Sequence, residues 1–297
     1  MSTFIFTDNT SDLHCQDKYK DFGIVNISFT IDGKTYEGES QEYTVKNFYD
    51  DMRAGAKVST AMINQQQFLD TFEPVLKEGK DILYLSFSSA LSGTYNSACI
   101  AARELQEKYP NNKIEVFDTL NASLGEGLFV HYMLEKREKG ASLEELVEYA
   151  NSIVNNVCSY FIVDDLKHLA RMGRVSKTAA FIGELIQIKP VLYVNKLGEL
   201  IPISKVKTRK KALKALVDKM EDKMLSADKQ EVIYIGHGDC VEDAQFVADE
   251  IKERFGIDSI MIDYIGPVIG AHTNAGVVAL FFLGENKIEE KDARVNS

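Results

Sequence analysis

Residues 82–98 read ILYLSFSSALSGTYNSA, and this stretch passes from an apolar run through a hydroxyl-rich segment into a helical pattern. The apolar run at 82–85 has the length and composition of a buried strand. After Gly93 the apolar positions recur at helical spacing, at Ala98, Ala101, Ala102 and Leu105. The hydroxyl-rich segment is therefore predicted at the carboxyl end of a strand and the amino end of a helix. Open α/β sheets bind ligands at that edge, because helix N–H groups are unpaired there.

The hydroxyl groups of this segment have two interpretations. In the first, Ser92 caps the helix and the other hydroxyls close the turn. In the second, they donate hydrogen bonds to an anion or an acid group. The residues concerned are Ser86, Ser88, Ser89, Ser92 and Thr94.

Strand and helix patterns alternate through the first half of the chain. Strands are predicted at 3–7, 22–29, 82–85 and 113–117, and helices follow cap signals at Thr44, Asn64 and Ser142. Asp32-Gly33 is a hairpin signal, and residues 57–64 are predicted to form a loop. Such alternation predicts an α/β lobe with a parallel sheet covered on both faces.

The pattern changes near residue 158. A strand at 160–163 and a short helix and turn at 166–176 precede two runs, 187–194 and 200–206, that are predicted to pair as a hairpin. Strands at 231–235, 259–263 and 277–283 and helices at 209–224 and 244–255 follow, with a glycine-rich turn at 266–273. The hairpin predicts an α+β lobe with a mixed sheet. The expected division is 1–157, 158–284 and a charged, mobile tail at 285–297.

Composition limits the classes of function. The chain has 297 residues with 34 basic and 45 acidic side chains, and its net charge of −11 argues against a nucleic acid partner. No secretory signal opens the chain, and the apolar stretch at 275–283 is too short to span a bilayer. The four cysteines have no metal-binding spacing and are expected to be reduced, in a cytoplasmic protein. They are Cys15, Cys99, Cys158 and Cys240.

A basic run is the local exception to the acidic composition. It is interpreted either as a solvated helix face or as a docking surface for an acidic partner or a phosphate. Its members are Lys205, Lys207, Arg209, Lys210, Lys211 and Lys214.

A serine hydrolase is one chemical hypothesis, with Ser92 as nucleophile and His272 or His237 as base. However, no Gly-x-Ser-x-Gly elbow surrounds Ser92. The chain also lacks a Walker-type phosphate loop and a Gly-x-Gly-x-x-Gly after its first strand, and its histidines and cysteines show no metal-binding pairs. No metal centre is therefore expected.

Several motifs, in this order along the chain, resemble the DegV family of bacterial fatty-acid-binding proteins. They are the Asp8 turn, Ser59-Thr60, the segment 88–95, Gly173-Arg174-Val175-Ser176, Ile188-Lys189-Pro190 and His272-Thr273. The resemblance covers about residues 3–283 as one DegV-type domain. It implies two lobes, with one long acyl chain such as palmitate or oleate buried in a channel between them. It also implies presentation of the acid to a fatty acid kinase for phospholipid synthesis, and hence a role in lipid transport and fatty acid metabolism.

The resemblance also implies which residues bind the ligand. Thr60 and Ser92 match the hydroxyl pair that holds the carboxylate, and Arg174 and His272 match positions that complete the polar network. The full implied set is Ser59, Thr60, Ser92, Gly93, Arg174, His272 and Thr273. The chain departs from the family in two places: after Thr60 it has Ala-Met-Ile-Asn for Ser-Gln-Pro-Ser, and after Thr273 it has Asn-Ala for Gly-Pro. The second departure alters the channel mouth or the kinase surface.

The physical chemistry of such a ligand agrees with these residue types. A fatty acid needs a few donors at one end and an apolar channel for the rest, with no nucleophile and no cofactor. Burying about sixteen carbons at roughly 0.8 kcal/mol each represents on the order of 12 kcal/mol before the entropic costs of binding. The sequence therefore favours a non-catalytic lipid-binding protein, with a Ser92-dependent esterase as the alternative.

Overall fold

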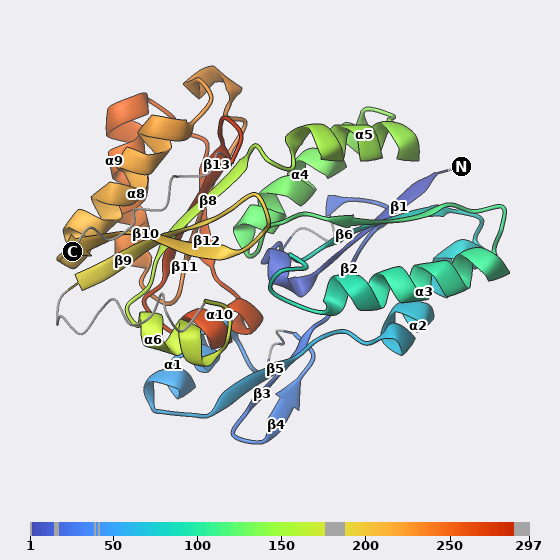
Figure 1. The fold of residues 1–297 in the computed structure, drawn as a ribbon, viewed down its shortest axis with the longest axis horizontal. Helices are drawn as coiled ribbons and strands as arrows, with labels where there is room; N and C mark the ends of the chain where they lie inside the picture. The colour runs from blue at the N-terminus through green and yellow to red at the C-terminus, as the bar shows by residue number, and fades with distance from the viewer. Residues whose placement is uncertain (1, 15–17, 39, 41, 176–187, 288–297) are drawn as a thin grey trace.

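The amino-terminal lobe contains the parallel sheet that the sequence predicts. The computed structural model describes residues 2–14, 18–38, 40, 42–175 and 188–287. Four parallel strands pair in the order β2-β1-β6-β7. Their bounds are Thr3–Asp8 (β1), Phe22–Val25 (β2), Asp81–Ser86 (β6) and Ile114–Asp118 (β7). Two helix layers cover the sheet, α2 (Gln65–Lys77) and α3 (Thr94–Lys108) on one face and α4 (Leu124–Glu138) and α5 (Leu143–Ile153) on the other (Figure 1).

The hairpin signal at Asp32-Gly33 is confirmed, because this turn joins the first two strands of a small antiparallel sheet beside the amino-terminal lobe. The third strand of that sheet is absent from the sequence prediction. The sheet has the order β4-β3-β5, with β3 at Ser28–Ile31, β4 at Lys34–Tyr36 and β5 at Val58–Ala61. The single strand expected at 22–29 is wrong: the chain leaves the parallel sheet after Val25 and begins β3 at Ser28. The loop expected at 57–64 is also wrong, because Val58–Ala61 pairs with β3. Helix α1 (Val45–Arg53) packs on this sheet through Phe48 and Tyr49.

The carboxy-terminal lobe is built on a mixed sheet, as expected. Six strands lie in the order β10-β9-β8-β13-β11-β12, and only β11 and β12 are parallel neighbours. The strand bounds are Val157–Ile162 (β8), Ile188–Val194 (β9), Leu200–Lys207 (β10), Ile233–His237 (β11), Ile260–Tyr264 (β12) and Val278–Leu283 (β13). Helices α8 (Arg209–Lys223) and α9 (Val241–Phe255) cover its outer face, and the first lobe lies toward its inner face (Figure 1).

Strand alternation divides the core between the two faces of this mixed sheet. On β8, Tyr160 and Ile162 pack into the outer core beneath α8 and α9, whereas Phe161 faces inward. On β13, Leu280 belongs to the outer core and Phe281 to the inner one. The inner core is continuous with the core of the amino-terminal lobe, so the two lobes share one apolar interior.

Two short helices complete the junction between the lobes. They are α6 (Leu166–Arg171) and α10 (Pro267–Thr273), which lie side by side below the mixed sheet (Figure 1). The glycine-rich turn expected at 266–273 is therefore wrong: Gly266 is the N-cap and Pro267 the first residue of a helix. Proline is favoured at that position because its missing N–H would be unpaired there in any case.

The local cap signals are confirmed at three helices. Thr44, Asn64 and Ser142 each accept a hydrogen bond from the backbone three residues later and complete a capping box. At α3 the N-cap is Gly93, and Ser92 Oγ accepts from Thr94 N at 3.2 Å. Parts of two predicted elements, 176 and 187, and tail residues 288–297 lie outside the described residues.

The predicted basic run lies at the end of β10 and the start of α8. Arg209 pairs with Asp164 and Asp243, and Lys214 pairs with Glu250. The remaining members, Lys205, Lys207, Lys210 and Lys211, are exposed. Cys99, Cys158 and Cys240 are free thiols, and Cys15 lies outside the described residues. Within the described part of the chain no helix has the length and apolarity needed to cross a membrane.

Candidate functional site

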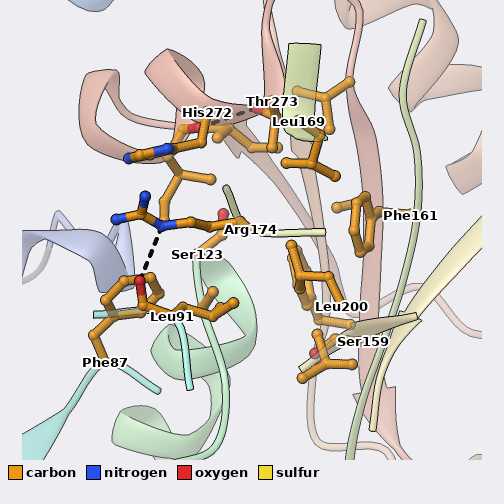
Figure 2. A pocket seen from close by; sticks show the side chains of 17 residues that line it. Phe87, Leu91, Ser123, Ser159, Phe161, Leu169, Arg174, Leu200, His272 and Thr273 are labelled. Carbon is orange, nitrogen blue, oxygen red and sulfur yellow. Dashed lines mark hydrogen bonds between the residues drawn. The ribbon is translucent and has the colours of Figure 1, made fainter. Parts of the chain in front are cut away.

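A cavity lies where the inner face of the mixed sheet meets α6, α10 and the loops of the amino-terminal lobe (Figure 2). It encloses about 580 Å³ of space between atoms, part of it open to solvent. The lining side chains are Phe87, Leu91, Ala122, Ser123, Ser159, Phe161, Leu169, Arg174, Val194, Leu200, Ile265, Ile269, His272, Thr273, Val277, Ala279 and Phe281. Most of them are apolar.

The apolar wall follows from the alternation of strand residues. Phe161 on β8 and Ala279 and Phe281 on β13 face inward because their neighbours fill the outer core. Val194 and Leu200 flank the turn between β9 and β10 and close the wall on that side. An aliphatic ligand placed here would contact carbon atoms along most of its length.

Arg174 and His272 lie next to each other on one side of this cavity, whereas Phe161, Leu200 and Ser159 lie on the other (Figure 2). The guanidinium group of Arg174 donates from Nε to the carbonyl of Leu91 at 3.0 Å and from Nη1 to the carbonyl of Met172 at 2.6 Å. These bonds hold the cation beside the segment that the sequence singled out. We call Arg174 and His272, with Thr60 behind them, the polar end of the cavity.

His272 links the polar end to the small antiparallel sheet. Its Nε2 lies 3.0 Å from Thr60 Oγ1, and its buried Nδ1 has no hydrogen-bond partner among the described residues. Burial, the largest effect, together with the positive charge of Arg174 and the proximity of His168, lowers the pKa of His272 to about 4. The ring is therefore neutral at pH 7, and Arg174 carries the positive charge of the polar end.

The other predicted hydroxyl group, on Ser92, is turned toward its own helix. Ser92 Oγ lies 2.9 Å from Thr94 Oγ1 and accepts from Thr94 N. The Ser92-Gly93 segment nevertheless borders the polar end, because the preceding carbonyl of Leu91 binds Arg174. Gly93 also lies beneath Met62, two residues beyond Thr60. The fold thus brings the segments around Thr60, Ser92 and Arg174 together.

Thr273 lines the cavity, and its hydroxyl donates to the carbonyl of Ile269 at 3.1 Å. Ser59 lies elsewhere. It is exposed and alternates with Thr60 on β5, so its side chain leaves the opposite face of that strand. The structure therefore does not bring Ser59 to the cavity.

Two polar residues that line the cavity, Ser123 and Ser159, are not in the predicted binding set. Ser123 Oγ donates to Asp12 at 2.5 Å, and Ser159 Oγ lies 2.9 Å from Asn121 Oδ1. Alternation along β8 could have found Ser159, because it shares a face with Phe161. Nothing local marks Ser123 as a wall residue, since its place depends on the contact between the lobes.

The serine hydrolase hypothesis finds no catalytic pair in the geometry. No described histidine lies within hydrogen-bonding distance of Ser92 Oγ, whose partners belong to Thr94. His272 contacts Thr60, and His237 Nδ1 accepts from the backbone of Cys240 at 3.3 Å. No group of three or more potential metal ligands occurs among the described residues.

The fold and the cavity define a two-lobed α/β protein with a mostly apolar cavity at the lobe junction and one polar end. A family model described as an uncharacterised protein of the DegV family matches residues 2–285. A DegV domain-containing protein from Clostridium perfringens is 46% identical over 285 residues, which are 95% of this chain and 98% of that protein. The chain belongs to the DegV family.

Solved structures show the same two-lobed arrangement. A protein from Streptococcus agalactiae, described as a fatty acid binding DegV family protein, has a TM-score of 0.84 at 29% identity, covering 96% of this chain and all 100% of its own. A protein from Thermotoga maritima, described as a DegV lipid binding protein, has a TM-score of 0.82 at 28% identity and covers 97% of this chain and 100% of its own. The predicted family and fold class are confirmed.

Proposed function

We propose that this protein binds one long-chain fatty acid in the cavity, with the carboxylate at the polar end and the acyl chain along the apolar wall. The observation that carries this proposal is the segregation of the lining: Arg174 and His272 lie together, and the remaining wall is mostly hydrocarbon. The descriptions of the relatives from Streptococcus agalactiae and Thermotoga maritima support the same ligand class.

The charges of the polar end favour an ionised acid over a neutral lipid. A carboxylate beside Arg174 gains a charge-assisted hydrogen bond, which is stronger than one between neutral groups. Neutral His272 adds no charge, but its partnerless Nδ1 can exchange a hydrogen bond with the ligand. Thr60 and Ser92 supply hydroxyl groups once they turn from their present partners.

The biological role that we propose is non-catalytic. The protein would hold the acid in the cytoplasm and present its carboxylate to a fatty acid kinase, so that the acyl phosphate enters phospholipid synthesis. The absence of a histidine next to Ser92 in the described structure supports a carrier over an esterase. The Asn274-Ala275 sequence lies directly after α10 and would belong to the surface that meets the kinase.

Native mass spectrometry of the purified protein tests the lipid proposal. We expect an added mass that matches a fatty acid, lost on organic extraction and restored by palmitate or oleate. A protein at its bare sequence mass that takes up neither acid would refute the proposal. A panel of esters provides the parallel test of the alternative: turnover that disappears in Ser92→Ala would establish the esterase.

A further inference from the structure

Asp12 joins three parts of the molecule that are far apart in the sequence. It follows the 3-10 turn Asn9–Ser11 and is 5% exposed. One carboxyl oxygen, Oδ1, accepts from the backbone N–H of Gly266 at 3.0 Å, and the other, Oδ2, accepts from Ser123 Oγ at 2.5 Å. The carboxyl group therefore spans from the amino-terminal lobe to the start of α10 and to the start of α4.

The contact with Gly266 is too close for a side chain. A Cβ on Gly266 would lie 2.6 Å from Asp12 Oδ1, so only glycine allows the approach. Tyr49 holds the chain at the same place, because its hydroxyl donates to the carbonyl of Ile265, directly before Gly266, at 2.7 Å. The start of α10 is thus fixed by the first lobe, and α10 carries His272 at its other end.

The contact with Ser123 holds a strained residue. Ser123 has φ of 55° and ψ of −150°, a conformation that is unfavourable for a residue with a side chain and persists only where its surroundings impose it. Its side chain lines the cavity. Asp12 is thus bonded to a wall residue on α4 and to the helix that presents His272, although Asp12 itself does not line the cavity.

We propose that Asp12 is a positioning residue for ligand binding: its carboxyl group ties the start of α10 to the start of α4 and so sets the spacing of the cavity walls that carry His272 and Ser123. This inference rests on the proposed function, because the spacing matters only if the cavity holds a ligand. Loss of the tie would let α10 move away from α4 and would speed the release of a bound fatty acid.

Charged groups surround Asp12. Burial, the largest effect, and repulsion from Asp263 and Asp8 raise its pKa, whereas the bonds from Ser123 and Gly266 lower it, and the net pKa is about 8. Glu126 and Tyr49 are also close enough to interact with its charge. On the outer side, His14 and Glu37 line the same hollow as Asp12. Asparagine has the shape of this carboxyl group without its charge.

The test compares Asp12→Ala and Asp12→Asn with a matched control, Asp81→Ala. Asp81 is also buried and also accepts from a backbone N–H, that of Lys113, but it lies at the opposite end of β6 from the cavity. Stopped-flow displacement of a fluorescent fatty acid by oleate measures release. We expect release from Asp12→Ala to be about tenfold faster than from Asp81→Ala, because tenfold corresponds to about 1.4 kcal/mol, the size of one lost buried hydrogen bond.

Asp12→Asn should restore release at pH 7 to within about threefold of the original protein, because its amide keeps an acceptor for Gly266 and can donate to Ser123. Equal release rates in Asp12→Ala and Asp81→Ala, or release from Asp12→Asn as fast as from Asp12→Ala, would overturn the proposal.

Amide hydrogen exchange of the lipid-free proteins separates this proposal from the proposed function. Asp12→Ala should exchange faster than the original protein in residues 266–273 and at the start of α4, with β6 unchanged, whether or not the cavity binds a fatty acid. Faster exchange there without any lipid binding would refute the proposed function alone. Unchanged exchange in 266–273 would refute the tie itself.

Discussion

Thr7 has one hydroxyl hydrogen and two buried neighbours, the carbonyl oxygen of Leu85 at 2.9 Å and Glu126 Oε1 at 2.8 Å. A carbonyl oxygen only accepts hydrogen bonds, so both contacts are bonded only if Thr7 donates to Leu85 and Glu126 donates to Thr7. Glu126 must then be protonated. Burial raises the pKa of Glu126 well above its usual value, and the nearby Asp8 raises it further.

This proton predicts the behaviour of Glu126→Gln. Because the pKa of Glu126 is raised in the folded state, its stabilising effect is complete below about pH 4.3, the usual pKa of the free side chain, and declines as pH rises toward the folded-state pKa. Glutamine keeps a donor for Thr7 and has no charge to lose. We expect Glu126→Gln to change the free energy of unfolding by less than about 1 kcal/mol at pH 5 and to become relatively more stable at pH 8, and Glu126→Ala to lose about 2–4 kcal/mol.

Urea unfolding at the two pH values measures both variants. If the loss in free energy of unfolding caused by Glu126→Gln grows with pH, the carboxyl group is ionised in the folded protein.

The hydroxyl groups of Thr60 and Ser92 have different partners in the structure. Substituting each one therefore distinguishes a role in ligand binding from a role in helix capping. Thr60 contacts His272, whereas Ser92 accepts from the first turn of α3. We expect Thr60→Ala to weaken fatty acid affinity by about 0.5–3 kcal/mol with little change in melting temperature. Ser92→Ala should lower both affinity and stability, the latter by about 1 kcal/mol.

Ser59→Ala is the matched control, because Ser59 lies next to Thr60 on the opposite, exposed face of β5. Calorimetric titration with oleate and thermal unfolding measure the two effects. Unchanged affinity in both Thr60→Ala and Ser92→Ala would remove these hydroxyls from the site and leave them as structural residues.

At the scale of elements, the β9–β10 hairpin docks on the hydroxyl-rich segment through Gly198. Ser88 Oγ donates to the carbonyl of Gly198 at 2.9 Å, and a Cβ on Gly198 would lie 2.1 Å from that hydroxyl oxygen. The hairpin places Val194 and Leu200 in the cavity wall. Ser88 therefore holds the part of the wall that β9 and β10 supply.

Gly198→Ala should displace this hairpin. Gly140 has a similar φ, +87° against +78°, but open space around its Cα, so Gly140→Ala reports the backbone strain alone. That strain is worth about 1–2 kcal/mol. Gly198→Ala should cost at least about 1 kcal/mol more in urea unfolding and should also weaken fatty acid binding. Equal losses in the two variants would mean that the hairpin adjusts without cost.

The elements that the sequence predicts wrongly are those whose pairing is distant. Residues 58–61 have no alternating apolar pattern, and they form a strand because β3 supplies a partner some thirty residues earlier. Residues 266–273 contain two glycines, and they form a helix because Asp12 and Tyr49 fix its start and its residues pack between the lobes. Cap signals act within three residues, which is why they were predicted correctly.

At the scale of the whole molecule, the shared apolar core predicts one cooperative unfolding transition. The core that lines the cavity contains residues of both lobes, including Leu83 and Phe281. A ligand that binds the folded state at about 100 times its dissociation constant adds about 2.7 kcal/mol, which for a chain of this size corresponds to about 5–10 °C in melting temperature.

Differential scanning calorimetry of delipidated protein with and without oleate measures this shift. We expect a single transition that moves as a whole, with decanol, which has no carboxylate, producing a smaller shift. Two transitions, only one of them moved by the ligand, would place the binding energy in one lobe.

The sequence by itself determined the parallel and mixed sheets and the helix caps at Thr44, Asn64 and Ser142. These depend on periodicity and on contacts between near neighbours, which a linear pattern records. The resemblance of its motifs to known proteins determined the family and predicted a site for an acid with an apolar tail. The motifs also named Thr60, Arg174 and His272 as candidates. Whether each of these side chains binds a fatty acid stays a prediction.

Only the tertiary structure decided which of those side chains meet. Thr60 and His272 are 212 residues apart in the chain and 3.0 Å apart in space. The side chain of Ser59, one residue from Thr60, faces away because successive side chains of a strand point to opposite faces of the sheet. The tie through Asp12 and the strained backbone of Ser123 are equally invisible in the sequence, because each exists only where the two lobes close on each other. Folding brings distant residues together through the burial of a common core. Because these contacts join residues far apart in the chain, no short stretch of sequence predicts them.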